Sequence, residues 1–170
     1  MARSPDSRGR SPWLSLLVVV TMASPVAAQQ IVIAGDVPEP RTVGPAELAK
    51  LHRYEVSASD HGRPPVTYSG FALGDVLGLA GLTLGESLRG PRLASVVLVE
   101  AADGYRVAFA LAELDGGLGD RMVLVVDRAG GQPLDAKAGP LRLVVPSERR
   151  GARWIRQVQK IWVLQVRPPT

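Results

Sequence analysis

Residues 139–146 read GPLRLVVP and residues 151–154 read GARW, and these two stretches are the most informative in the chain. The apolar run at 141–145 predicts a buried strand that ends at a proline. The chain then crosses an arginine-rich loop and returns at an Arg-Trp pair. Arg142 alternates with leucines, so we expect it to face away from one core layer and to pair with a carboxylate such as Glu100 or Glu113.

The composition predicts one globular domain with an aliphatic core. The chain has 170 residues, of which 46% are hydrophobic, 21% charged and only 5% aromatic. This balance is typical of a folded protein and unlike that of a disordered chain. Valine, leucine and alanine must therefore fill most of the interior, and no internal repeat or linker divides the sequence.

The first 28 residues have the pattern of a secretory signal peptide. Three arginines within the first ten residues precede an apolar run at 13–23, and Val-Ala-Ala at 26–28 fits a cleavage site. An uncleaved membrane anchor is the alternative, but the run is shorter than the ~20 residues that a span needs. We therefore predict a signal peptide at 1–28 and a single mature domain at 29–170. The mature protein is expected in the periplasm or secreted, without a stable membrane anchor.

Charge and cysteine usage exclude several classes of protein. Removing 1–28, which holds three Arg and one Asp, lowers the formal net charge from +4 to +2. The basic balance is thus no sign of nucleic-acid binding, and we predict no nucleic-acid partner. The chain has no cysteine. It therefore has no disulfide, no thiolate nucleophile and no cysteine-ligated metal.

The hydrophobic pattern predicts an α+β domain of mixed β-sheets with short helices. A short helix should open at Gly44-Pro45, and a second should cover 73–80 and end at Gly81. Asp103-Gly104 predicts a two-residue hairpin turn in which both residues take positive φ. The expected strands are 31–33, 54–58, 66–68, 95–102, 105–110, 122–127, 141–145 and 158–166.

Five motifs together resemble a known family. Besides 139–146 and 151–154, they are YSGFALGDVL at 68–77, DGY at 103–105 and GQPL at 131–134. In this order, over roughly residues 53–165, they resemble the oxidoreductase molybdopterin-binding domain of the sulfite oxidase family. The resemblance implies that fold, a molybdopterin cofactor, and oxygen-atom or electron transfer. It adds no ligand role for DGY, which the hairpin alone explains.

The resembled family ligates molybdenum through a cysteine, and this chain has none. In the family that cysteine lies between the strand matching 54–58 and the motif at 68–77. Here residues 57–60 read Ser-Ala-Ser-Asp, and serine is a poor ligand for molybdenum compared with a soft thiolate. We therefore assign no catalytic and no metal-ligating residue. The missing thiolate favours a chain with no bound cofactor over one that carries molybdopterin.

Two loops supply the candidate cofactor-binding residues. By resemblance, the basic residue before Trp154 contributes to the pocket for the pterin phosphate, and the planar fork of arginine suits phosphate. The candidates are His61, Arg63, Arg149, Arg150 and Arg153. Alternatives stay open: Asp60 and His61 can form a plain turn, and Arg153 can belong to a solvated loop or pack flat on Trp154.

The sequence leaves three functions to weigh. The first is an exported non-catalytic module that binds a small anionic or pterin-like ligand, or serves an envelope redox or protein partner. The second is a molybdopterin-dependent oxidoreductase with a non-cysteine site. Arg8-Gly9-Arg10 is not the twin-arginine pair used by exported members of the family, which favours the first. A hydrolase using Ser57, Asp60 and His61 has little support, because adjacent residues seldom adopt triad geometry. A zinc site is disfavoured too, since the chain has only two histidines.

Overall fold

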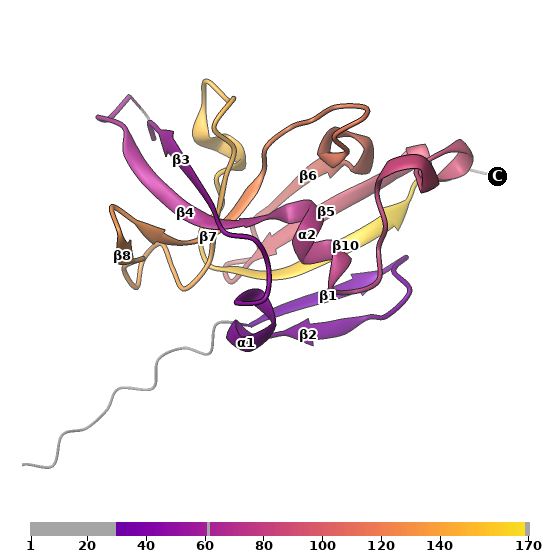
Figure 1. Cartoon of the computed structure of the whole chain (residues 1–170), viewed down its shortest axis with the longest axis horizontal. Helices are drawn as coiled ribbons and strands as arrows, with labels where there is room; N and C mark the ends of the chain where they lie inside the picture. The colour runs from indigo at the N-terminus through magenta and orange to yellow at the C-terminus, as the bar shows by residue number, and fades with distance from the viewer. Residues whose placement is uncertain (1–29, 61, 169–170) are drawn as a thin grey trace, which may run out of the picture.

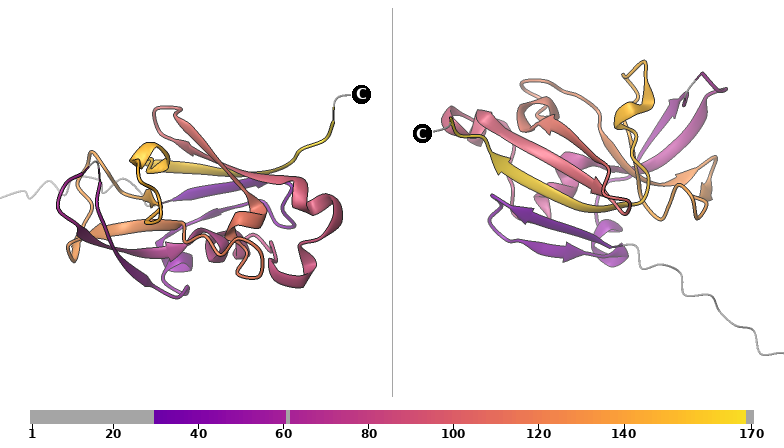
Figure 2. Two further views of the ribbon diagram at one scale, coloured as in Figure 1. Left: turned by 90° about the horizontal axis from the view of Figure 1, so that it is seen from above. Right: turned by 180° about the vertical axis from the view of Figure 1, so that it is seen from behind.

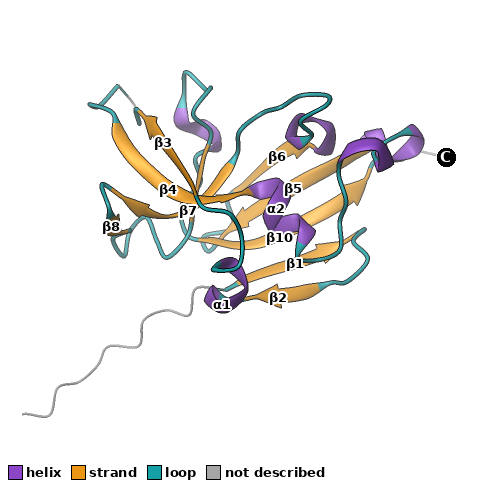
Figure 3. Cartoon of the chain, viewed as in Figure 1, coloured by secondary structure: helices purple, strands orange, loops and turns teal. Residues whose placement is uncertain are grey.

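The computed structural model describes residues 30–60 and 62–168, and within them the chain forms two β-sheets (Figures 1 and 3). One sheet has the strand order β2-β1-β10-β5-β6. The other has the order β3-β4-β7-β8, with β9 also paired to β7. The predicted signal peptide and the candidate ligand His61 lie outside the described residues. The predicted α+β fold of mixed sheets with short helices is confirmed.

The elements follow the predicted segments closely. The sequence analysis missed the short strands β2 and β8 and the single-turn 3₁₀ helices, which carry no clear hydrophobic period. The strands are β1 (Ile31–Gly35), β2 (Arg41–Val43), β3 (Tyr54–Ala58), β4 (Val66–Ala72), β5 (Ser95–Ala101), β6 (Arg106–Ala110), β7 (Leu124–Ala129), β8 (Gln132–Pro133), β9 (Arg142–Val144) and β10 (Val158–Gln165). The helices are α1 (Pro45–Leu48), α2 (Leu73–Gly78), η1 (Gly85–Ser87), η2 (Gly90–Ala94), η3 (Leu111–Leu114) and η4 (Gly151–Arg153).

The first sheet joins the two ends of the described chain. β1 runs parallel to β10, with Val32 opposite Lys160, and every other pair in this sheet is antiparallel. Residues of β5 alternate between buried and half-buried along the whole strand, as a sheet with one face on the core requires. Figure 2 shows this sheet as one layer, with β4, β7 and α2 in a second layer across the core.

The second sheet depends on a glycine in its central strand. β4 pairs with β3 on one side and with β7 on the other, and its register with β7 shifts between Ser69 and Gly70. A Cβ atom at Gly70 would lie 2.2 Å from the carbonyl oxygen of Val125. The close approach of the two backbones at this bulge therefore needs glycine.

The hairpin between β5 and β6 differs from the predicted two-residue turn. The Gly104 amide donates to the Ala101 carbonyl at 3.0 Å, and the Ala101 amide donates to the Tyr105 carbonyl at 2.9 Å. The loop therefore has three residues, and within it only Gly104 takes a positive φ, of 82°. Asp103 instead accepts a hydrogen bond from the Tyr105 amide at 2.9 Å. This is the type I turn followed by a left-handed glycine that three-residue hairpin loops use.

A single cluster of apolar side chains fills the space between the layers. It includes Ile33 of β1, Leu77 of α2, Val125 of β7 and Ile161 of β10, all fully buried. Of the three residue types predicted to fill the interior, valine and leucine dominate it, whereas alanine contributes fewer members than isoleucine. Among the described residues, no helix is long and apolar enough to cross a membrane.

A candidate anion-binding groove

The arginine-rich loop connects the second sheet, which contains β9, to the first sheet, which contains β10. It runs from the end of β9 through η4 to β10, and in Figure 1 it stands between the β3–β4 hairpin and β6. The view from behind in Figure 2 shows the same order. The loop is anchored by Trp154, whose Nε1 donates to the Val145 carbonyl at 3.0 Å from a buried position.

Arg142 is a buried cation at the start of β9. Its side chain is 9% exposed, and its Nη2 donates to Oδ2 of Asp60 at 2.6 Å. The guanidinium carbon lies 5.8 Å from the ring centre of Tyr68 and 5.7 Å from that of Trp154, so two aromatic walls hold it. The predicted pairing with Glu100 or Glu113 is therefore wrong. Asp60, 82 positions away in sequence, can reach Arg142 because the β3–β4 hairpin and β9 belong to the same sheet.

One donor of Arg142 stays unused. The Nε atom is buried and has no hydrogen-bond partner among the described residues. Leaving a donor buried and unpaired costs about 1–3 kcal/mol, and more when the group is charged, so such an atom calls for an explanation. A ligand that accepts a hydrogen bond from this guanidinium would remove that cost.

Arg142 lines a groove of about 430 Å³. Its walls are the β5–β6 loop, with Asp103 and Tyr105, and the segment from η4 into β10, with Trp154 and Arg156. Lys137 stands at the rim, exposed like Arg156. Three cations against one carboxylate give the lining residues a formal charge of +2, and the Asp60 carboxylate paired with Arg142 lowers it to +1. The arrangement suits a small anion with an aromatic or planar body beside Trp154.

Arg153, the leading candidate from the sequence, is engaged in protein contacts. Its Nε donates to Glu148 Oε1 at 2.6 Å, and its Nη1 donates to the Ala108 carbonyl on the edge of β6 at 3.0 Å. The guanidinium stacks on Phe109, with 4.3 Å between its carbon and the ring centre. The alternative that Arg153 packs flat on Trp154 is therefore wrong, since the aromatic partner is Phe109.

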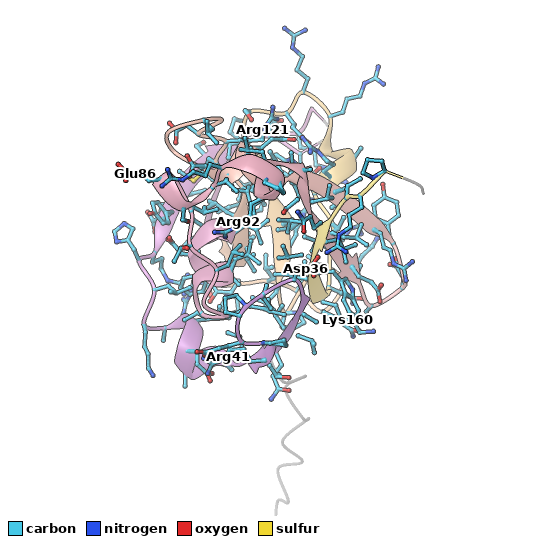
Figure 4. The ribbon with its side chains drawn as sticks, turned by 90° about the vertical axis from the view of Figure 1, so that its right-hand side faces the viewer. Asp36, Arg41, Glu86, Arg92, Arg121 and Lys160 are labelled. Carbon is cyan, nitrogen blue, oxygen red and sulfur yellow. The ribbon has the colours of Figure 1, made fainter. Side chains whose placement is uncertain are left out.

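Glu113 and Arg121 complete a four-residue charge cluster with Arg153 and Glu148. Arg121 lies 2.9 Å from Glu113 and 3.8 Å from Glu148, so the two signs alternate. Figure 4 shows Arg121 well apart from Lys160, whose Nζ lies 3.4 Å from Glu100 on the first sheet. Arg106 also contacts Glu100, and this contact, followed by the one from Lys160, lowers the pKa of Glu100 below its ordinary value. The cluster around Arg153 ties the arginine-rich loop to β6.

The other predicted residues are spread over the surface. Arg149 and Arg150 are exposed and make no hydrogen bond or ion pair with a described residue. Arg63 is exposed too, and its amide donates to the Asp60 carbonyl at 3.1 Å in the predicted turn. His61 lies outside the described residues. None of the described candidates lines the groove at Arg142, so the assignment of Arg63, Arg149 and Arg150 to a ligand stays a prediction.

The residues present do not fit a thiolate-held metal. The chain contains no cysteine, and the described residues include no group of three or more His, Asp or Glu placed to hold a metal ion. The donor chemistry fits the anionic part of a cofactor better. A guanidinium with a buried free donor is suited to a phosphate oxygen and repels a metal ion.

The sequence did hold a signal for Arg142. It is the one charged residue in the apolar run 141–145, and a cation inside a buried strand needs a partner or a function. The sequence could not identify that partner, because Asp60 lies 82 positions away. The sequence instead favoured the exposed residues Arg149 and Arg150 as ligand-binding candidates, because they are adjacent in an arginine-rich loop.

The comparisons agree with the fold. The family model for the oxidoreductase molybdopterin binding domain matches residues 64–170. A solved structure, the sulfane dehydrogenase SoxCD from Paracoccus pantotrophus, is similar with a TM-score of 0.64 and 18% sequence identity. The similarity covers 81% of this chain and only 38% of that one. No curated protein sequence matches the chain.

Proposed function

Because the chain belongs to the oxidoreductase molybdopterin-binding domain family, we propose that it is a non-catalytic binding module that uses the family fold to hold a small anionic, pterin-like ligand. The ligand lies in the groove at Arg142, with its anionic group on the guanidinium and its planar part beside Trp154. The module works outside the cytoplasm, where it serves a ligand or an envelope partner.

The buried free donor of Arg142 carries this proposal. A buried guanidinium is costly to maintain, and Asp60 uses only one side of it. A phosphate group would accept the remaining hydrogen bonds in the bidentate geometry that arginine favours. Lys137 and Arg156 at the rim would attract the anion and orient it toward Arg142.

The missing thiolate supports binding without catalysis. Molybdenum is held in this family by a soft sulfur ligand, and the sequence offers hard oxygen donors at 57–60. The groove therefore retains features for an anion without a cysteine for the metal. The signal peptide predicted at 1–28 supports export by the general secretory route, which delivers an unfolded chain.

The alternative function is a molybdopterin-dependent oxidoreductase with a non-cysteine site. The family match over residues 64–170 favours it. When bound, molybdopterin would supply the redox chemistry, and Arg142 would hold its phosphate. No residue of this chain is assigned to the metal.

Anion binding is tested by titrating the purified chain with inorganic phosphate at constant ionic strength. Phosphate is expected to raise the melting temperature of the wild type, and Arg142→Met is expected to abolish this response. Arg89→Met makes the same charge change at an exposed arginine outside the groove and should respond like wild type. An equal phosphate response in Arg142→Met and wild type would refute the site. If Arg142→Met does not fold, Arg142→Lys, which keeps the charge, is titrated in its place.

A further inference from the structure

The ion pair between Asp60 and Arg142 sets the charge that a ligand meets. Asp60 is 19% exposed at the end of the β3–β4 hairpin, and Arg142 is 9% exposed on β9. At 2.6 Å between Oδ2 and Nη2, the carboxylate neutralises the guanidinium in a poorly solvated place. Charges interact strongly there, because little water screens them.

We propose that Asp60 is an internal competitor of the ligand, an anion built into the chain that lowers the affinity of Arg142 for external anions. This inference rests on the proposed function, since it concerns the same groove. Asp60 does not need to move for this effect. Its charge offsets that of Arg142, so an incoming anion meets a pair that is neutral as a whole.

The competition selects the class of ligand. A monoanion such as a carboxylate gains little from a guanidinium that already carries one carboxylate. A dianion gains more than a monoanion from the two cations at the rim, Lys137 and Arg156. Asp103, which also lines the groove, repels anions, so the rim cations must outweigh it. The groove therefore favours a phosphate monoester over a carboxylate.

A different role for Asp60 would reverse the effect of its removal. If the carboxylate mainly positioned the guanidinium for the ligand, then Asp60→Asn would weaken phosphate binding, because Arg142 would lose its fixed orientation. If Asp60 competes, the same variant binds phosphate more tightly. The sign of the change in affinity thus separates the two roles.

The experiment compares Asp60→Asn with Glu55→Gln by calorimetric titration of the full chain with inorganic phosphate and with acetate. Glu55 is exposed on β3 of the same hairpin, so both variants change the net charge equally. Asp60→Asn should lower the Kd for phosphate at least about tenfold and should also gain measurable acetate binding. Glu55→Gln should leave both affinities within about twofold, because an exposed charge is screened.

Each outcome decides between the proposals. Suppose that wild type binds phosphate and Arg142→Met does not. Unchanged or weaker phosphate binding by Asp60→Asn would then contradict competition by Asp60 but not the proposed function. No phosphate binding by any form would overturn both. If Asp60→Asn does not fold in chloride, its folding is compared in phosphate and in chloride at equal ionic strength. Folding in phosphate supports the proposal, and the same unfolded state in both salts contradicts it.

Discussion

At the scale of single residues, two arginines have surroundings that differ from those predicted from the sequence. Arg153 precedes Trp154 in the family motif and looked like the phosphate ligand, yet its donors contact Glu148 and the Ala108 carbonyl. Arg142 was expected to face away from one core layer and pair with Glu100 or Glu113, yet it is buried against Asp60, with its Nε unpaired among the described residues. Motif position pointed to the loop at Arg153, whereas the groove is lined by Arg142 and not by Arg153.

Arg153 is therefore expected to stabilise the fold. Arg153→Leu should lower the free energy of unfolding by about 2 kcal/mol, because Glu148 and the Ala108 carbonyl would lose a charged donor. Urea denaturation followed by circular dichroism measures this difference. Arg150→Leu is the matched control, since Arg150 is exposed, and it should change stability by less than about 0.5 kcal/mol. Equal stability of the two variants would show that the contacts of Arg153 contribute little.

The pairing of Asp60 with Arg142 shows what the sequence could not supply at this scale. The sequence contains both residue types, but a contact across 82 residues depends on how β4 and β9 both pair with β7. A local pattern carries no information about that shared neighbour. The predicted partners, Glu100 and Glu113, instead contact Arg106 and Arg121.

At the scale of elements, local chemistry explains most of what was predicted. The short helix at Pro45 has the expected start, where the Gly44 amide donates to Glu47 Oε2 at 2.9 Å. The strands followed from apolar alternation, and Gly104 supplies the left-handed residue of the hairpin. The loop was one residue longer than predicted, because a two-residue turn and a three-residue loop share the Asp-Gly signal.

Strand order was beyond the sequence. The parallel pairing of β1 with β10 joins segments from opposite ends of the described chain, and no local sequence pattern in either strand identifies its neighbour. The register shift beside Gly70 is similar, since it depends on where β7 lies against β4. Such features follow from the packing of the whole core.

Two glycines close together in sequence test the account of the second sheet. Gly70→Ala should lower the free energy of unfolding by about 3 kcal/mol, because the new Cβ would lie 2.2 Å from the Val125 carbonyl oxygen. Gly78→Ala is the control: it is exposed in α2, with nothing within 4 Å of the new Cβ. That change should raise stability by about 0.5–1 kcal/mol. Guanidinium denaturation measures both, and a mild effect at Gly70 would contradict the close approach of the two strands.

At the scale of the whole molecule, the chain combines the family fold with a sequence that contains no cysteine. The chain has the mixed sheets of the molybdopterin-binding domain and belongs to that family. It spans 38% of the sulfane dehydrogenase chain to which its structure is similar. It lacks any cysteine, while Arg142 keeps a buried donor beside a cationic groove. These features together favour a module that retains anion binding without the metal's sulfur ligand.

The direct test of this account is the molybdenum and pterin content of the protein purified from the envelope of its native host. Mass spectrometry measures the metal, and fluorescence measures the released pterin. The account predicts no stoichiometric molybdenum in the folded protein, whether or not a pterin or another small anion is bound. One molybdenum per chain together with one pterin would contradict it and would establish a cofactor site built without cysteine.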